Sequence, residues 1–176
     1  MAMDLSRITV RPFKLADADD MLLWAGDDRV TGNTRLDVCV SKEQAIAFIR
    51  DECMAQEFKR SICMDDRSIG IIWVIPWLGE DNFKADLGYA IGFKYWGKGI
   101  ATKAVKIVLS QVFNVLPYLK RLQAFTLVEN KASQRVLQKV GFQREGVLRK
   151  FFYFKGNFED FLVHSFLSTD EIPPLD

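Results

Sequence analysis

The stretch Lys94-Tyr-Trp-Gly-Lys-Gly-Ile-Ala-Thr102 decides the fold of this chain. It follows an apolar run over residues 87–93 that is typical of a strand, and it opens a segment with apolar residues at helical spacing: Ala101, Ala104, Val105, Val108, Leu109 and Val112. A glycine-rich loop between a strand and a helix predicts a site for a phosphate-bearing ligand. Glycines let the ligand approach the backbone, and the free N–H groups of the first helical turn attract negative charge.

The loop does not fit the two commonest nucleotide-binding patterns. A Walker A loop requires Lys and then Ser or Thr directly after its second glycine, but Gly99 is followed by Ile100. A dinucleotide fingerprint requires a third Gly or Ala, and Thr102 holds that place. It also requires an acidic residue about twenty positions further on, where this chain has Leu, Lys and Arg over residues 119–121. These mismatches argue against a nucleotide-binding protein. The alternative that the glycines only form a tight turn between the strand and the helix stays open.

A second pattern lies downstream, over residues 128–146. Asn130 is suited to cap a helix, because its side chain accepts a hydrogen bond from a free N–H, and Gly141 is suited to end that helix. Ser133 falls on one helical face with apolar residues: Val136, Leu137 and Val140. A buried hydroxyl needs a partner, so a cofactor is one candidate ligand for Ser133. The structural alternative is a hydroxyl that only bonds a backbone carbonyl within the helix.

Together the two patterns resemble the GNAT superfamily of N-acetyltransferases. The coenzyme A loop of that family reads Gln/Arg-x-x-Gly-x-Gly/Ala, and residues 94–99 match it except at Lys94, which keeps the positive charge. The downstream block resembles the Asn-x-x-Ser…Gly-Phe…Glu-Gly signature of the RimJ/RimL-like branch, the ribosomal-protein alanine acetyltransferases and their relatives. The resemblance runs from about Ile8 to Leu167.

The resemblance implies the GNAT fold, an α/β (α+β) arrangement with a mixed central sheet of about seven strands flanked by about four helices. The sequence pattern agrees. It predicts strands over 7–13, 60–64, 68–75, 84–93, 121–128, 142–153 and 158–167, and helices over 15–25, 41–57, 97–115 and 130–140. A single domain is expected over residues 1–176, with a core over about 7–167 and a flexible tail over 168–176.

The resemblance also implies acetyl-CoA as the cosubstrate. Its pyrophosphate would lie on the backbone of the loop, and its pantetheine arm would bond the backbone of the preceding strand. The residues expected to bind it are Ile91, Gly92, Phe93, Lys94, Trp96, Gly97, Lys98, Gly99, Ile100, Ala101, Thr102, Asn130, Ser133 and Arg135. No metal is expected, because the three cysteines have no metal-ligand spacing.

The expected reaction is direct attack of a primary amine on the acetyl thioester, in a ternary complex. It requires a base for the amine and a proton donor for the leaving thiolate. Many GNAT enzymes have a Tyr donor where this chain has Leu137. The RimJ/RimL-like branch is thought to use the Ser that matches Ser133, which is therefore the expected acid. The base stays open between water and five side chains, of which the first two are preferred: Asp86, Glu145, Glu159, Asp160 and His164.

Composition limits the partners. The net charge is +1 with scattered basic residues, which indicates no nucleic-acid surface. The longest apolar run, over 69–78, is too short for a membrane span. Cysteines typical of reduced thiols favour the cytoplasm, with the nucleus as an alternative location. The expected partners are acetyl-CoA and an amine acceptor, either a protein N-terminus or a small-molecule amine, in a monomer or homodimer. Trp24 and residues 27–35 are candidates for an acceptor wall. A non-catalytic acyl-CoA-binding module is the alternative function.

Overall fold

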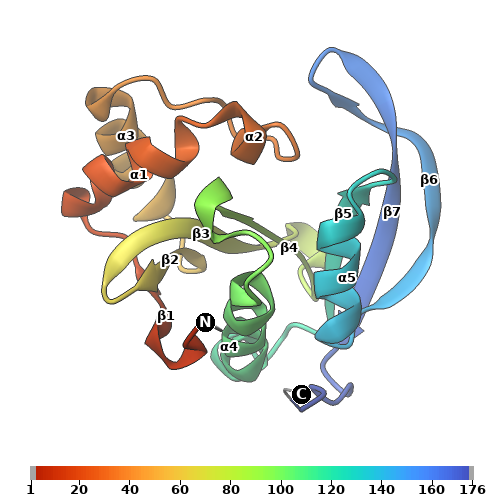
Figure 1. The fold of residues 1–176 in the computed structure, drawn as a ribbon. Coiled ribbons are helices and arrows are strands. Elements are labelled where there is room, and N and C mark those ends of the chain that lie inside the picture. Colours follow the sequence, from red (N-terminus) through yellow and green to blue (C-terminus); the bar gives the residue numbers. More distant parts are fainter. Residues whose placement is uncertain (1–2, 175–176) are drawn as a thin grey trace. The chain divides into compact units, whose positions relative to one another are not determined.

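The structure is a computed structural model that describes residues 3–174. In this part of the chain, seven strands form one mixed sheet in the order β1-β2-β3-β4-β5-β7-β6 (Figure 1). The strands are β1 (Ile8–Pro12), β2 (Lys59–Met64), β3 (Arg67–Pro76), β4 (Lys84–Ile91), β5 (Arg121–Leu127), β6 (Gln143–Phe154) and β7 (Asn157–Leu167). The parallel pair is β4–β5, whereas β1–β2, β2–β3, β5–β7 and β6–β7 are antiparallel. The predicted mixed α/β fold is confirmed.

The described residues form five α-helices: α1 (Ala18–Ala25), α2 (Asp28–Thr31), α3 (Lys42–Phe48), α4 (Ile100–Val115) and α5 (Lys131–Lys139). None of these helices, within the described ranges, has the length and apolar character needed to span a membrane. Contacts divide the chain into two compact units. The first contains the residues up to Trp73 and Tyr89–Ala104, and the second contains Val74–Gly88 and the residues from Val105 onward.

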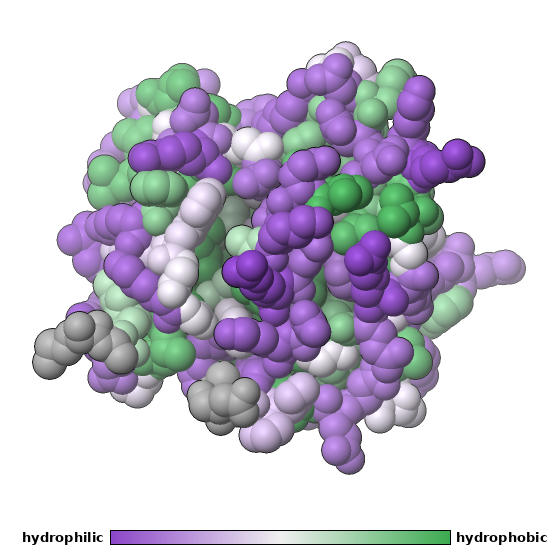
Figure 2. Space-filling view, turned by 45° about the vertical axis from the view of Figure 1, so that its right-hand side comes forward, coloured by the Kyte–Doolittle hydropathy of each residue, from purple (hydrophilic) through white to green (hydrophobic). Residues whose placement is uncertain are grey.

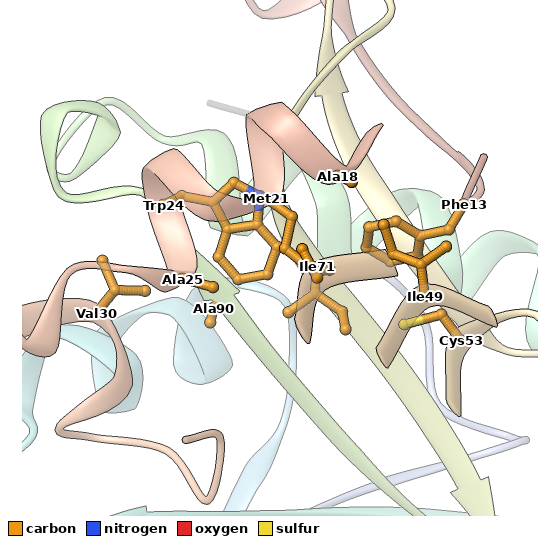
Figure 3. Packing of buried hydrophobic residues seen from close by; sticks show 11 residues of the cluster. Phe13, Ala18, Met21, Trp24, Ala25, Val30, Ile49, Cys53, Ile71 and Ala90 are labelled. Atoms are coloured by element: carbon orange, nitrogen blue, oxygen red, sulfur yellow. The ribbon is translucent and has the colours of Figure 1, made fainter. Parts of the chain in front are cut away.

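The core of the first unit forms where α1 and α3, which lie side by side, meet β3 (Figures 1 and 3). In α1, Ala18, Met21 and Ala25 recur at helical spacing and are all buried. They pack with Ile49 and Ile71, neither of which has accessible surface. Trp24, a candidate for the acceptor wall, is also buried in this cluster, so its ring contributes to the core and does not line an open surface.

The core of the second unit lies between α4 and the sheet. The predicted apolar stripe of α4 is buried at Val105, Val108, Leu109 and Val112. The ring centroid of Phe166, on β7, lies 6.2 Å from that of Phe113 on α4. Helix and sheet therefore bury their apolar faces against each other, as layered α/β packing requires. On the face shown in Figure 2, hydrophilic side chains predominate and hydrophobic ones gather in small areas between them.

The structure corrects the predicted boundaries around the glycine loop. The strand expected over 84–93 ends at Ile91, and Phe93–Tyr95 forms a 3-10 turn. The helix expected from residue 97 begins at Ile100. Gly97 and Gly99 have φ values of +72° and +77°, which no right-handed helix contains.

The other predicted helices are also shorter than expected. The segment expected over 15–25 begins with a 3-10 turn at Leu15–Asp17 before α1. The segment expected over 41–57 is regular only over α3, and Ile49–Cys53 continues it as a π-helical turn. Residues 27–35, expected as a loop, contain the short helix α2.

The tail shows no helix or strand over residues 168–174, but it is tied to the second unit. Ser168 N donates to Lys120 O at 3.0 Å, and Lys106 Nζ donates to Pro174 O at 2.8 Å. Residues 168–174 are coil, as the sequence predicts, and the flexibility expected of them stays a prediction. The last two residues of the predicted tail lie outside the described residues.

Candidate active site

The loop between β4 and α4 contains two left-handed turns, at Gly97 and Gly99. A Cβ atom added at Gly97 would meet no atom within 4 Å, and one at Gly99 would lie 3.4 Å from Leu5 Cδ1. Glycine at position 97 is therefore needed for its backbone conformation, because side-chain-bearing residues rarely adopt this φ. The exposed backbone of residues 97–99, here called the cradle, is therefore open to the approach of a ligand.

The start of α4 directly follows the cradle and has N–H groups without acceptors within the helix. The first helical hydrogen bond runs from Lys103 N to Gly99 O, at 3.0 Å. The N–H groups of the residues before Lys103 have no acceptor one turn earlier, as at every helix N-terminus. They lie at the positive end of the helix dipole, so the loop is suited to a phosphate. The residues present therefore fit the pyrophosphate of coenzyme A.

Two lysines add positive charge to the loop. Lys98 Nζ donates to Lys94 O at 2.7 Å and so closes the loop on itself. The ammonium groups of Lys94 and Lys98 lie 4.9 and 5.8 Å from the ring centroid of Tyr95. Both lysine side chains are exposed, which leaves them available to a phosphate.

An indole hydrogen bond holds the base of the loop. Trp96 Nε1 donates to Ile91 O at 2.7 Å, and the Trp96 ring meets Phe93 edge-on with 5.1 Å between centroids. Gly92 N donates to Ile69 O on β3 at 2.8 Å. A Cβ at Gly92 would approach Trp24 Cβ to 3.1 Å, so only glycine packs here without displacement. The predicted coenzyme residues from Ile91 to Thr102 thus form one continuous structure in the first unit.

The predicted residues of the second motif lie at the start of α5, in the second unit. Asn130 Oδ1 accepts the N–H of Ser133 at 3.1 Å, so the predicted helix cap is confirmed. Gln134 Nε2 donates to Leu127 O and Val128 O at 3.1 and 2.9 Å, which fixes the helix start to the end of β5. Ser133 is half-buried and Arg135 is exposed.

Asp86 receives two hydrogen bonds on one oxygen. Trp77 Nε1 donates to Asp86 Oδ1 at 2.9 Å, and Gln123 Nε2 donates to the same atom at 3.4 Å. The β4–β5 register places Asp86 opposite Gln123, so both point to the same side of the sheet. Neither of these donors reaches Oδ2. The half-buried carboxylate is therefore oriented while one oxygen stays clear of both bonds.

Glu145 is bound much more firmly. Arg121 Nη1 and Nη2 donate to its two oxygens at 2.8 and 2.5 Å, and Ser165 Oγ donates to Oε1 at 2.7 Å. The hydrogen bonds from Arg121 and then Ser165 lower the pKa of Glu145 to about 2. A carboxylate with so low a pKa is a weak proton acceptor.

Arg121 also connects the two carboxylates. Its Nε donates to Gln123 Oε1 at 2.9 Å, and Gln123 bonds Asp86. The sequence interpretation gave Arg121 and Gln123 no role and did not connect Trp77 with Asp86. The one available signal was the i, i+2 spacing of Arg121 and Gln123, which puts both side chains on one face of a strand.

The remaining base candidates lie elsewhere in the second unit. Asp160 Oδ1 accepts the N–H of Lys150 at 2.7 Å, and Glu159 lies beside it on β7. His164 is 3% exposed, and burial lowers its pKa. Its Nδ1 finds no partner among the described residues. A side chain so deeply buried does not reach a substrate from outside.

The expectation that the protein binds no metal stays a prediction. Within residues 3–174, no group of three or more His, Cys, Asp or Glu side chains is placed to hold a metal ion. Cys39, Cys53 and Cys63 are all free thiols.

Comparison with known proteins matches residues 7–143 to the model of the acetyltransferase (GNAT) domain. A curated relative is the uncharacterized N-acetyltransferase YoaA of Bacillus subtilis. It is 32% identical over 175 residues, which cover 96% of this chain and 98% of YoaA.

Two solved structures share the fold. A GNAT-family acetyltransferase from Bacillus anthracis has a TM-score of 0.83 at 23% identity, covering 97% of this chain and 100% of that chain. Mycobacterium smegmatis RimJ, in complex with CoA-disulfide, has a TM-score of 0.77 at 23% identity, covering 92% of this chain and 82% of that chain. The chain therefore belongs to the GNAT family of acetyltransferases and is an N-acetyltransferase.

Proposed function

We propose that this protein transfers the acetyl group of acetyl-CoA to a primary amine by direct attack in a ternary complex. The observation that carries the proposal is the cradle, an exposed glycine backbone with positive φ values that directly precedes the N-terminus of α4. The RimJ structure, which has a similar fold, is a complex with CoA-disulfide. This supports coenzyme A as the ligand of the corresponding loop.

Residues 91–102 would bind the coenzyme mainly through their backbone. The N–H groups at the start of α4 would bind the pyrophosphate, and Lys94 and Lys98 would add charge. The carbonyls of Ile91, Gly92 and Phe93 already accept bonds from Trp96 Nε1, Tyr95 N and Trp96 N. Gly92 N already donates to Ile69 O, so the pantetheine bonds are assigned mainly to the other N–H groups of this segment. Asn130, Ser133 and Arg135 are proposed as further contacts on the strength of the family signature.

Ser133 is proposed as the proton donor to the leaving thiolate. A thiol has a pKa near 8.5, so the thiolate leaves without a strong acid, and a hydroxyl donor suffices. Ser133 lies in the first turn of α5 and is half-buried, which suits a group that meets a ligand.

Asp86 is proposed as the base in preference to Glu145. Its carboxylate is oriented by Trp77 and Gln123 but carries no ion pair among the described residues, whereas Glu145 is committed to Arg121. A protein α-amine, with a pKa near 7.7–8.0, needs less help from a base than a lysine side chain near 10.4. A protein N-terminus is therefore the acceptor that best suits a carboxylate base, and a small-molecule amine is the alternative.

The test is a thermal melting series with acetyl-CoA, with ATP and NAD as controls. A ligand that binds only the folded state raises its stability, so acetyl-CoA alone is expected to raise the Tm. Thiol release is then measured with peptides bearing free or blocked N-termini and with small amines. Stabilisation together with amine-dependent thiol release supports the proposal. Absence of stabilisation at millimolar acetyl-CoA would overturn it, and stabilisation without turnover of any amine would favour an acyl-CoA-binding module.

A further inference from the structure

Arg29 lies in α2, outside the residues expected to bind the coenzyme, and its guanidinium is held in one direction. Asp27 caps α2 by accepting the N–H of Arg29 on Oδ1 at 3.0 Å. The same carboxylate accepts Arg29 Nε at 2.8 Å and Nη2 at 2.6 Å. A two-point ion pair fixes both the position and the plane of a guanidinium.

Buried side chains hold the backbone of α2 in place. Val30 and Thr31, which follow Arg29, are 3% and 1% exposed, and Val30 belongs to the core cluster with Trp24 and Ala90 (Figure 3). The helix thus presents Arg29 outward from an anchored backbone. Arg29 itself is largely exposed, with 58% of its side-chain surface accessible.

The guanidinium covers the ring of Phe93, the residue that follows β4 and Gly92. Arg29 Cζ lies 3.8 Å from the Phe93 ring centroid, within the range of a cation–π contact. Phe93 also meets the edge of Trp96, whose indole N–H holds Ile91 O. A series of contacts therefore runs from Asp27 through Arg29, Phe93 and Trp96 to the end of β4.

We propose that Arg29 is a positioning residue for acetyl-CoA binding, which acts through Phe93 and not by touching the coenzyme. Phe93 is 43% exposed, so its ring is held by these contacts more than by burial. Fixing the ring fixes the backbone of residues 91–93 that the pantetheine arm is proposed to bond. The inference rests on the proposed function, since it concerns the same coenzyme.

A double-mutant cycle on acetyl-CoA affinity tests the proposal. The variants Arg29→Met, Phe93→Leu and the double variant are titrated by calorimetry. A cation–π contact at an exposed site corresponds to roughly a two- to five-fold change in Kd, so Arg29→Met is expected to weaken binding by that factor. If Arg29 acts through Phe93, the double variant binds no more weakly than Phe93→Leu alone. Independent effects that add would mean a direct contact with the coenzyme and would overturn the proposal.

Arg50→Met is the matched control. Arg50 is 61% exposed and makes a two-point pair with the adjacent Asp51, through Nε at 2.6 Å and Nη2 at 2.8 Å, but within the described residues its guanidinium covers no aromatic ring. Arg50→Met is expected to leave the Kd for acetyl-CoA unchanged. If it raises the Kd as much as Arg29→Met does, the effect of Arg29 comes from general surface charge and the positioning role is rejected. Arg29→Lys, which keeps a cation, is expected to recover part of the affinity.

Two further measurements separate the ways in which the inference can fail. Melting of the ligand-free variants shows whether each is folded. If the wild-type protein binds acetyl-CoA and Arg29→Met binds it equally well, only the positioning role is rejected. If the wild-type protein does not bind acetyl-CoA at all, both the proposed function and the positioning role are rejected.

Discussion

Asp86 and Glu145 are two carboxylates on one face of the sheet in the second unit, and their partners differ. Glu145 accepts hydrogen bonds from the Arg121 guanidinium and the Ser165 hydroxyl, which lower its pKa to about 2. Asp86 receives only neutral N–H donors. At the scale of single residues, this difference in partners makes Asp86 the better candidate for the base.

Asp86→Asn is expected to lower kcat at pH 7 by about 10²-fold, because an amide cannot accept the proton of the amine. The loss should shrink as the pH rises above the pKa of the amine, since a neutral amine no longer needs a base to become nucleophilic. A pH profile of kcat measures this. Glu145→Gln serves as the control and is expected to keep its kcat; a profile of Asp86→Asn that matches the wild type at every pH would rule out Asp86.

Ser133→Ala is expected to reduce kcat by about 10²-fold while acetyl-CoA still raises the Tm. The reason is that the hydroxyl is proposed to protonate the leaving thiolate, whereas the loop in the first unit is proposed to bind the phosphates. Kinetics by thiol release and melting with acetyl-CoA separate the two effects. Full turnover by Ser133→Ala would exclude the acid role.

At the scale of the loop, Gly97→Ala is expected to lower the free energy of unfolding by about 1 kcal/mol, because alanine is strained at a φ of +72°. It is also expected to weaken acetyl-CoA binding, because the methyl group enters the open cradle. Gly79→Ala provides the comparison, since Gly79 has a φ of +67° and no neighbour within 4 Å of an added Cβ. Equal losses of acetyl-CoA affinity in both variants would contradict the binding role of the loop.

At the scale of the helix, Asn130→Ala is expected to lower the free energy of unfolding by about 1 kcal/mol, because the N–H of Ser133 loses its hydrogen-bond acceptor. Asn130→Asp should keep most of the stability, since aspartate caps equally well. Chemical denaturation measures both. Ser41→Ala removes the corresponding cap of α3, where Ser41 Oγ accepts Gln44 N at 3.2 Å. It should cost similar stability without changing acetyl-CoA affinity, whereas Asn130→Ala is expected to weaken that affinity as well.

At the scale of the whole molecule, stability is expected to fall as the pH is lowered, in two steps. The pKa of His164 is lowered by burial, so the unfolded chain takes up that proton first and stability declines below about pH 6.5. The pKa of Glu145 is lowered from 4.5 to about 2, so stability declines again as the pH falls from about 4.5 toward 2.

Glu145→Gln checks the second step by urea unfolding at a series of pH values. The pair with Arg121 is partly exposed and screened by solvent, so its loss should cost no more than about 1 kcal/mol at pH 7. The variant should show a smaller decline than the wild type below pH 4.5. An undiminished decline would show that other carboxylates cause the acid instability.

The sequence by itself determined the family, the number of strands and their order along the chain, and the glycine loop with the helix that follows it. These features depend on local patterns, namely the apolar periodicity of α4, the glycines at 97 and 99 and the cap at Asn130. Each pattern acts within a few residues along the chain, so reading the chain in order is enough to find it.

Only the tertiary structure decided which side chains meet. Arg121 and Glu145 are 24 residues apart, and their pair depends on the register of β5, β7 and β6. Arg29 reaches Phe93 because α2, which the sequence did not predict, is held by a two-point pair with Asp27 and a buried inner face. Register and helix placement follow from the packing of the core, a sum over many distant contacts that no local pattern contains.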